Sequence, residues 1–494
     1  MKSMSEKIIK SFEEADSDVF GDILYEGRKK KNAKIGLLTC GYFEYWRMYP
    51  ETLKKNVSAD LERLKDNFKK RFDNIVYSDL VDTLDGAEEA GELFVKEGVD
   101  ALIVVYGTYM PDFITLHVIN KLKNIPVLFF SVQNTDKIDV NGDYEHSLRN
   151  SGTIGISQIT GTMRKMNRKY KVIVGSIDDE RAFGKIETFV KANQAIADIK
   201  EANIGVIGNV FRGMYDLELS KTFLKSTFDV NIIYIQASHL LDQWETVTDD
   251  EVKAVADKLL NRFKKRDITD DDVMRAVKLA IAMEKLSKKF RLDAMCFLDQ
   301  HFVQKQTRTT ARIGASLLME YSNMTVNCEG DLGGLVTMML MKSISGTPAL
   351  MAEWGEYDKD LNTCLVMGHG IGVPALAASD DKVTLTPTPE EWGFEGSGLN
   401  YEFILKPGKS TIAHIIETAH GYKMIVSPAE SLDFPTLNYS EMHAVLQVKT
   451  PIQDYLEKVF ESGVTHHCIA GVGDMSKELC MVAEYLGVEI FYIE

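Results

Sequence analysis

Apolar and polar positions follow a repeating pattern over residues 1–178. Short, nearly continuous apolar runs alternate with longer stretches in which apolar residues recur every three or four positions. Residues 34–40 (KIGLLTC) form the first run. Residues 51–72 follow, with apolar side chains on one helical face: Leu53, Val57, Leu61, Leu64, Phe68 and Phe72. This alternation predicts a parallel sheet whose strands are joined by amphipathic helices.

The same alternation continues in a second unit that begins near residue 178. The strands predicted in the first unit after residue 40 are 74–78, 100–106, 126–132 and 170–174. The strands predicted in the second unit are 203–208, 230–235 and 291–298, and its helices are 179–200, 249–265, 269–288 and 306–320. We therefore expect two α/β domains, at residues 1–178 and 179–350.

The pattern changes after about residue 350. Short β-type runs broken by glycine and proline replace the helical periodicity, at residues 363–367, 382–386, 400–405, 410–417 and 423–427. A helix is predicted only at 453–462, near the end. Residues 351–494 are expected to form an antiparallel sheet or barrel. The expected fold class is α/β, with two Rossmann- or flavodoxin-like parallel-sheet domains followed by a mostly antiparallel β-barrel domain.

Composition narrows the possible functions. The 494 residues carry a formal net charge of -16, which repels phosphate backbones and anionic membranes. No segment approaches the roughly 18 consecutive apolar residues of a membrane-spanning helix, and the amino terminus lacks the apolar stretch of a signal peptide. We expect a cytoplasmic protein that binds neither nucleic acid nor membranes, and whose six cysteines, none in a CxxC pair, are free thiols.

Chemically useful side chains gather in the last third of the chain. Residues 327–334 (NCEGDLGG) place Glu329 and Asp331 at a loop beside glycines, just before an apolar helix. Asp331 is explained more simply as the cap of that helix. Glu353 follows the apolar run at residues 348–352 and precedes Trp354. A carboxylate at this point can bind a divalent cation or transfer a proton. A solvated acidic turn and a role for Glu356 are the alternatives.

Histidines complete the set. His369 is flanked by glycines at the end of a predicted strand, where an imidazole is exposed to a cleft. His466 and His467 are adjacent, and because neighbouring residues of a strand point to opposite faces, only one is expected to enter a given site. A structural histidine pair explains them equally well. Carboxylates combined with imidazoles suit Mn²⁺ better than the thiolate-rich sets of structural zinc.

In order and approximate interval, these motifs resemble the L-arabinose isomerases and the related L-fucose isomerase group. The matching elements are Glu329-Gly-Asp331, Glu353 within residues 351–358, Gly368-His369 and the pair His466-His467. The resemblance extends faintly to the amino-terminal strand at 37–41 and the segment YPETL at 49–53.

The resemblance implies an aldose–ketose isomerase that converts L-arabinose to L-ribulose through a cis-enediol. Metal ligands would be Glu329, Glu353, His369 and His467, for Mn²⁺ or a similar cation such as Co²⁺ or Mg²⁺. Glu329 and Glu353 would be the catalytic acid/base pair. The residues implied near the sugar are Gln133, Tyr42, Glu44 and Trp46. A homo-oligomer, with a hexamer expected, would share active sites between subunits.

Departures from the family pattern concern the substrate. The loop GYFEYW at 41–46 is more aromatic than the polar loop of a typical arabinose isomerase, and Trp354 and Gly355 alter the segment after the second glutamate. L-fucose and D-galactose are therefore alternative substrates. A non-catalytic sugar-binding protein is the alternative from another functional class, since two α/β domains around a cleft also describe sugar receptors.

Overall fold

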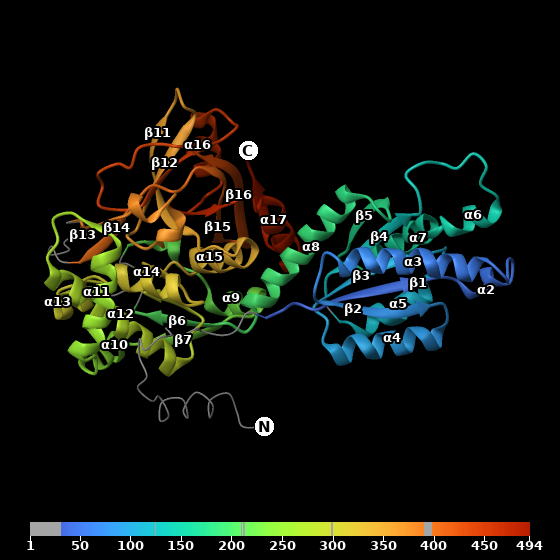
Figure 1. Cartoon of the computed structure of the whole chain (residues 1–494), viewed down its shortest axis with the longest axis horizontal. Helices are drawn as coiled ribbons and strands as arrows, with labels where there is room; N and C mark the ends of the chain where they lie inside the picture. The colour runs from blue at the N-terminus through green and yellow to red at the C-terminus, as the bar shows by residue number, and fades with distance from the viewer. Residues whose placement is uncertain (1–30, 124, 209, 211–212, 298–299, 390–397) are drawn as a thin grey trace. The chain divides into compact units, whose positions relative to one another are not determined.

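The structure is a computed structural model, and it describes residues 31–123, 125–208, 210, 213–297, 300–389 and 398–494. Two compact units divide these residues, one formed by residues 31–197 and the other by residues 198–494 (Figure 1). The three domains expected from the sequence, with boundaries at 178/179 and 350/351, stay a prediction.

The amino-terminal unit is built on a five-stranded parallel sheet of order β2-β1-β3-β4-β5. Its strands are β1 (Ile35–Cys40), β2 (Ile75–Val81), β3 (Ala101–Tyr106), β4 (Val127–Gln133) and β5 (Lys171–Ser176). Its helices are α2 (Phe43–Trp46), α3 (Leu53–Lys69), α4 (Leu84–Glu97), α5 (Asp112–Lys121), α6 (Tyr144–Arg149), α7 (Gly152–Lys165) and most of α8 (Glu180–Ile199).

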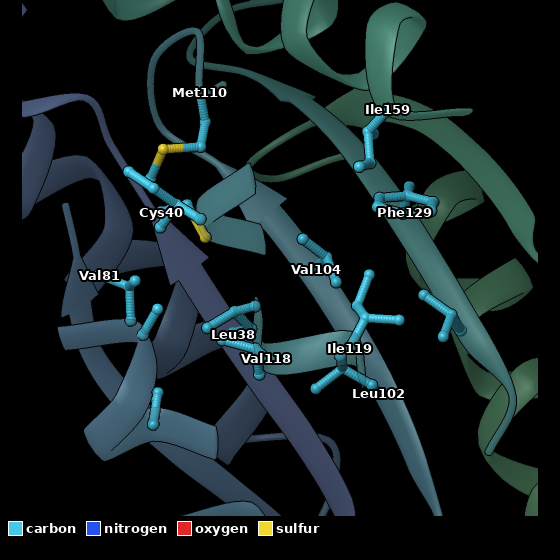
Figure 2. Close-up of a cluster of buried hydrophobic side chains, with 14 of the residues drawn as sticks. Leu38, Cys40, Val81, Leu102, Val104, Met110, Val118, Ile119, Phe129 and Ile159 are labelled. Atoms are coloured by element: carbon cyan, nitrogen blue, oxygen red, sulfur yellow. The ribbon is translucent and has the colours of Figure 1, made fainter. Parts of the chain in front are cut away.

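Both faces of this sheet are covered, which explains the continuous apolar runs of β1 and β3. On one face, Leu38, Leu102, Val104 and Phe129 pack with apolar residues of α4, α5 and α7 (Figure 2). On the other face, the ring of Phe183 from α8 contacts aromatic rings of α3 and β4.

The carboxy-terminal unit begins with a second parallel sheet, of order β10-β9-β6-β7. Its strands are β6 (Asn203–Ile207), β7 (Asn231–Ile235), β9 (Ala294–Phe297) and β10 (Thr325–Cys328). The helices are α9 (Lys221–Phe228), α10 (Ala237–Glu245), α11 (Asp249–Arg262), α12 (Asp270–Phe290), α13 (Gln300–Thr307), α14 (Arg312–Tyr321) and α15 (Leu332–Ser345), with a 3-10 turn η1 at Tyr215–Leu217. The single helix expected at 306–320 is thus divided between α13 and α14.

The rest of this unit is mostly antiparallel. Strand pairing runs β15-β18-β11-β12-β17-β16 and returns from β16 to β15, which closes a barrel, and β19 adds to β16 in parallel. The strands are β11 (Leu350–Asp358), β12 (Thr363–Gly368), β15 (Gly408–Thr418), β16 (Gly421–Ser431), β17 (His443–Gln447), β18 (His467–Val472) and β19 (Glu489–Tyr492). Two helices, α16 (Ile452–Glu461) and α17 (Ser476–Leu486), accompany it, and β8 (Lys264–Lys265), β13 (Thr384–Pro387) and β14 (Leu399–Glu402) form a small separate sheet.

These sheets confirm the expected α/β fold class and the antiparallel carboxy-terminal region. Helix α15 lies between the second parallel sheet and the barrel, and it contacts β9, β10, β15 and β18 (Figure 1). The end of β10 and the start of α15 therefore face the barrel strands. No helix in the described part of the chain has the length and apolar character needed to cross a membrane.

The carboxy-terminal unit contains a buried histidine, His443, whose protonation makes the stability of the unit depend on pH. His443 Nε2 accepts a hydrogen bond from the Leu437 backbone N–H at 2.9 Å, and its Nδ1 donates to the Glu441 carbonyl at 3.0 Å. This arrangement requires a neutral ring. Burial lowers the pKa of His443, against a smaller opposing effect of the Glu402 carboxylate.

Because the folded pKa of His443 lies below its unfolded value, its stabilising contribution is present above about pH 6.5 and is lost as the pH falls. We predict that His443→Gln, whose amide can donate and accept without titrating, flattens the fall in stability between pH 7 and 5. The difference in slope should reach at most about 1.4 kcal/mol per pH unit, the value for one proton. Urea unfolding midpoints across this range measure it, with exposed His420→Gln as control. Equal slopes for wild type and His443→Gln would contradict the prediction.

Candidate active site

Glu329 stands in a tight turn between β10 and α15. Its φ is 60° and that of Gly330 is 76°, so two consecutive residues adopt the left-handed conformation, which is strained for a glutamate. The backbone N–H of Glu329 donates to the carbonyl of Phe297 at the end of the neighbouring strand β9. The turn brings the Glu329 side chain, 14% exposed, to the centre of a cluster of histidines and carboxylates.

Asp331 caps α15, as the sequence predicted, because its Oδ1 accepts a hydrogen bond from the Gly334 N–H at 2.7 Å. Its second oxygen has another role. Oδ2 accepts from His414 Nε2 at 2.9 Å and from His467 Nδ1 at 3.1 Å. The cap and the orientation of two barrel histidines thus depend on one buried carboxylate.

Strand register in the barrel places Glu353 and His369 beside His467. Glu353 of β11 pairs directly with His467 of β18 on one side and with Met367 of β12 on the other. His369 follows the last residue of β12. Its Nε2 lies 3.0 Å from Glu353 Oε1, its Nδ1 lies 3.8 Å from Glu329 Oε1, and its ring centroid is 5.0 Å from that of His467.

The two adjacent histidines both reach this cluster, contrary to the expectation that only one would. His466 precedes β18 rather than belonging to it, so strand alternation does not separate the two rings, whose centroids are 4.1 Å apart. His467 Nε2 is 3.2 Å from Glu329 Oε2, and His466 Nε2 is 3.8 Å from the same oxygen. One atom from each of Glu329, Glu353, His466 and His467 fits within a set whose members lie no more than 4.8 Å apart.

Carboxylates and imidazoles lie beside one another in this cluster, and each kind of group shifts the pKa of the other. The close contact with His369 lowers the pKa of Glu353. Burial works to raise the pKa of Glu329, but contacts with His466 and His467 outweigh it and hold that pKa well below its usual range. Burial likewise opposes protonation of His467, yet Asp331 and Glu329 raise the pKa of His467 to about 9.

The donor atoms fit a divalent cation. Among the described residues, Glu329 Oε2 and the Nε2 atoms of His369, His466 and His467 are buried without a hydrogen bond of acceptable geometry. Buried polar atoms are rarely left so. A cation at this point would satisfy carboxylate oxygens and imidazole nitrogens together, and it would replace the protons that the carboxylates otherwise stabilise on the rings.

The residues expected near a sugar belong to the amino-terminal unit. Tyr42, Glu44 and Trp46 lie in or beside α2, after β1, and Gln133 is the exposed last residue of β4. The Tyr42 N–H donates to Thr108 Oγ1 at 3.0 Å, which ties the loop after β1 to the loop after β3. In a sheet of this order, those two loops flank the point where strand order reverses, a common ligand position. Contact of these residues with a sugar stays a prediction.

Three contributors to the cluster escaped the sequence analysis in whole or in part. His414 on β15 and Asp216 on η1 carry no local motif, and each reaches the cluster only through the fold. His466 was recognised only as the rival of His467. The pairing of His466 with Asp216, which is 250 residues away, left no signal in the sequence.

Comparison with known proteins finds similarity to sugar isomerases. No family model matches the chain. A sulfoquinovose isomerase of Alkalicoccus urumqiensis is 22% identical over 378 residues, covering 75% of this chain and 81% of its own. A sulfoquinovose isomerase of Priestia aryabhattai is 20% identical over 370 residues, covering 74% and 79%. An L-arabinose isomerase of Shouchella clausii is 19% identical over 475 residues, covering 92% and 95%. These low-identity matches to named sugar isomerases confirm the resemblance to the L-arabinose isomerase-like proteins seen in the motifs.

A close approach between α15 and β15 fixes Asp331 opposite His414. A Cβ on Gly333 would lie 2.1 Å from the Ile415 carbonyl oxygen, so no larger residue fits without moving the helix or the strand. We predict that Gly333→Ala destabilises the protein by about 1–3 kcal/mol through overpacking. Urea unfolding measures the change.

The matched control is Gly161→Ala at an exposed position of α7, where an added Cβ meets no atom within 4 Å. There the substitution should stabilise by about 0.4–1 kcal/mol, as a glycine-to-alanine change in an unhindered helix does. Similar effects of the two substitutions would contradict the steric explanation.

Proposed function

We propose that this protein is a metal-dependent aldose–ketose isomerase that converts L-arabinose to L-ribulose or acts on a closely related aldose. The supporting observation is the convergence of Glu329, Glu353, His369 and His467 from four separate segments, in a family whose named members are sugar isomerases. A homo-oligomer, as the motif resemblance implies, is part of the same proposal.

The cation site consists of the two carboxylates and two imidazoles, and Mn²⁺ or a similar divalent ion suits this mixture of oxygen and nitrogen donors. When bound, such an ion polarises the oxygens next to the reacting carbons of the sugar. His467 is held by Asp331 through Nδ1, which directs its Nε2 towards Glu329. This is the carboxylate–imidazole arrangement that orients metal-binding histidines.

Glu329 and Glu353 provide the proton transfers. Isomerisation moves a proton between C1 and C2 of the open-chain sugar through a cis-enediol. One carboxylate accepts the carbon-bound proton and the other exchanges protons with the oxygens. The pKa of both glutamates is lowered, so both are ionised at neutral pH and able to accept a proton. Glu353 is also 37% exposed, which leaves it accessible to a substrate.

The relatives suggest a second candidate substrate. Several are named sulfoquinovose isomerases, and two of these match with 20–22% identity over about three quarters of the chain. A sulfonated sugar differs from L-arabinose by a permanent negative charge, so its sulfonate would need a cationic partner. Glu329 and Glu353 would act at the reacting carbons of either sugar, so a panel of sugars distinguishes the two candidates.

Removal of one carboxylate tests the metal site. We predict that Glu329→Gln abolishes tight Mn²⁺ binding and lowers turnover by at least about 10²-fold, because the variant loses both a ligand and an acid/base group. His467→Ala should have the same effect on Mn²⁺ binding. Titration calorimetry with Mn²⁺ after chelation, together with a ketose assay, measures both properties. The control is Glu356→Gln, which alters an exposed carboxylate of the same strand as Glu353 and should bind Mn²⁺ and turn over like the wild type. Full activity of Glu329→Gln after Mn²⁺ is restored would refute the assignment.

A panel of sugars in D₂O tests the reaction and its route. L-arabinose, L-fucose, D-galactose and sulfoquinovose are each incubated with the Mn²⁺-loaded protein. We expect ketose formation from L-arabinose or a closely related uncharged aldose, with deuterium on a carbon of the product, because the carboxylate that carries the proton exchanges with solvent.

Product without deuterium would indicate a hydride shift in place of proton transfer. Turnover of sulfoquinovose alone would move the substrate to the sulfonated sugars. Sugar binding without any ketose would indicate a binding protein and would contradict the proposed function.

A further inference from the structure

An aspartate from outside the barrel fixes the orientation of His466. Asp216 lies on η1, after β6, and its Oδ2 accepts two hydrogen bonds from one residue: from the His466 backbone N–H at 3.1 Å and from the ring Nδ1 at 2.6 Å. The two contacts determine both the position and the rotation of the imidazole.

The segment that carries Asp216 is attached to the barrel. Tyr422 of β16 donates its hydroxyl hydrogen to the Ser220 carbonyl at 3.0 Å, and the Ser220 N–H donates to Glu417 of β15 at 2.5 Å. Asp216 is therefore presented from an anchored turn rather than from a free loop.

With Nδ1 directed at Asp216, the other ring nitrogen of His466, Nε2, faces the cluster. That Nε2 is buried, makes no hydrogen bond among the described residues, and lies 3.8 Å from Glu329 Oε2. This atom is placed to form a hydrogen bond with a group that enters the site.

Exposure separates a closed side of the cluster from an open one. The side chains of His467, His369 and Glu329 are 0%, 10% and 14% exposed, whereas those of His466 and Glu353 are 33% and 37% exposed. A sugar therefore reaches the cluster past His466 and Glu353, while the other three groups close it from behind.

We propose that Asp216 is a positioning residue, which holds His466 so that its Nε2 forms a hydrogen bond with a hydroxyl group of the sugar. His466 then acts on the substrate side and stands outside the set of metal ligands. This inference rests on the proposed isomerase function and adds to it a substrate contact whose orientation is set by the segment after β6.

The test compares Asp216→Ala with Asp216→Asn in the full-length, Mn²⁺-loaded protein, using the aldose that the wild type turns over best. Asp216→Ala should raise KM about tenfold, the effect of losing one oriented hydrogen bond, and change kcat far less. Asp216→Asn keeps an oxygen acceptor at the same position and should restore KM to near the wild-type value. Neither variant should change the affinity for Mn²⁺ alone. The control is Glu218→Ala, which removes an exposed carboxylate of the same segment, paired with Lys221, and should leave all three quantities unchanged.

Each result bears on a different claim. A wild-type KM in Asp216→Ala would overturn the positioning role, as would an Asp216→Asn variant as impaired as Asp216→Ala. Mn²⁺ affinity reduced tenfold or more in Asp216→Ala would make His466 a metal ligand and overturn the substrate-side role. A wild-type protein that converts no aldose would contradict the proposed function itself, a failure that is visible before any Asp216 variant is made.

Discussion

The geometry of this site depends on the buried carboxylate of Asp331. Removing an unpaired carboxylate from water costs several kcal/mol, and a protein retains such a charge only where hydrogen bonds and opposite charges compensate. Asp331 has three such partners: the Gly334 N–H, His414 and His467. These come from α15, β15 and β18, so the charge is stable only when the helix and two barrel strands are correctly placed against one another. Burial of this charge therefore requires one particular packing of α15 against the barrel.

Strand register then determines where the remaining groups of the site lie. Once β18 is fixed by His467, its pairing with β11 places Glu353 directly beside it, and the pairing of β11 with β12 brings His369 to the same point. A slip of one residue between β11 and β18 would turn Glu353 to the opposite face of the sheet. The turn at Glu329 leads directly into the same helix cap, so the two glutamates approach one another although one follows a strand of the parallel sheet and the other lies on a barrel strand.

Periodicity in the sequence predicted most of the strands and helices, because burial on one or both faces leaves an apolar pattern in the chain itself. It did not predict the division of residues 306–320 into α13 and α14, although the polar run 305–310 extends into that break. It also did not predict the strand β10, whose four residues are too few to show a clear period. At the site, Glu329 and His369 were identifiable from glycines beside them, which mark an open turn. Glu353 and His467 depended on resemblance to a family, because their proximity comes from cross-strand pairing over a large sequence separation. Asp216 and His414 could not be found at all, because a single long-range hydrogen bond leaves no pattern of spacing.

The adjacent imidazoles of His466 and His467 have similar partners but differ in burial, and this difference suits them to different roles. Each has a carboxylate at Nδ1: Asp331 for His467 and Asp216 for His466. Both pairs therefore direct an Nε2 atom towards Glu329. His467 and Asp331 are shielded from solvent, which favours permanent binding of a cation whose loss would leave a buried charge imbalance. His466 and Asp216 are 33% and 39% exposed, so a ligand from solvent reaches this pair more easily than the buried one. The same side-chain pair thus suits a fixed ligand when buried and an exchangeable contact when exposed.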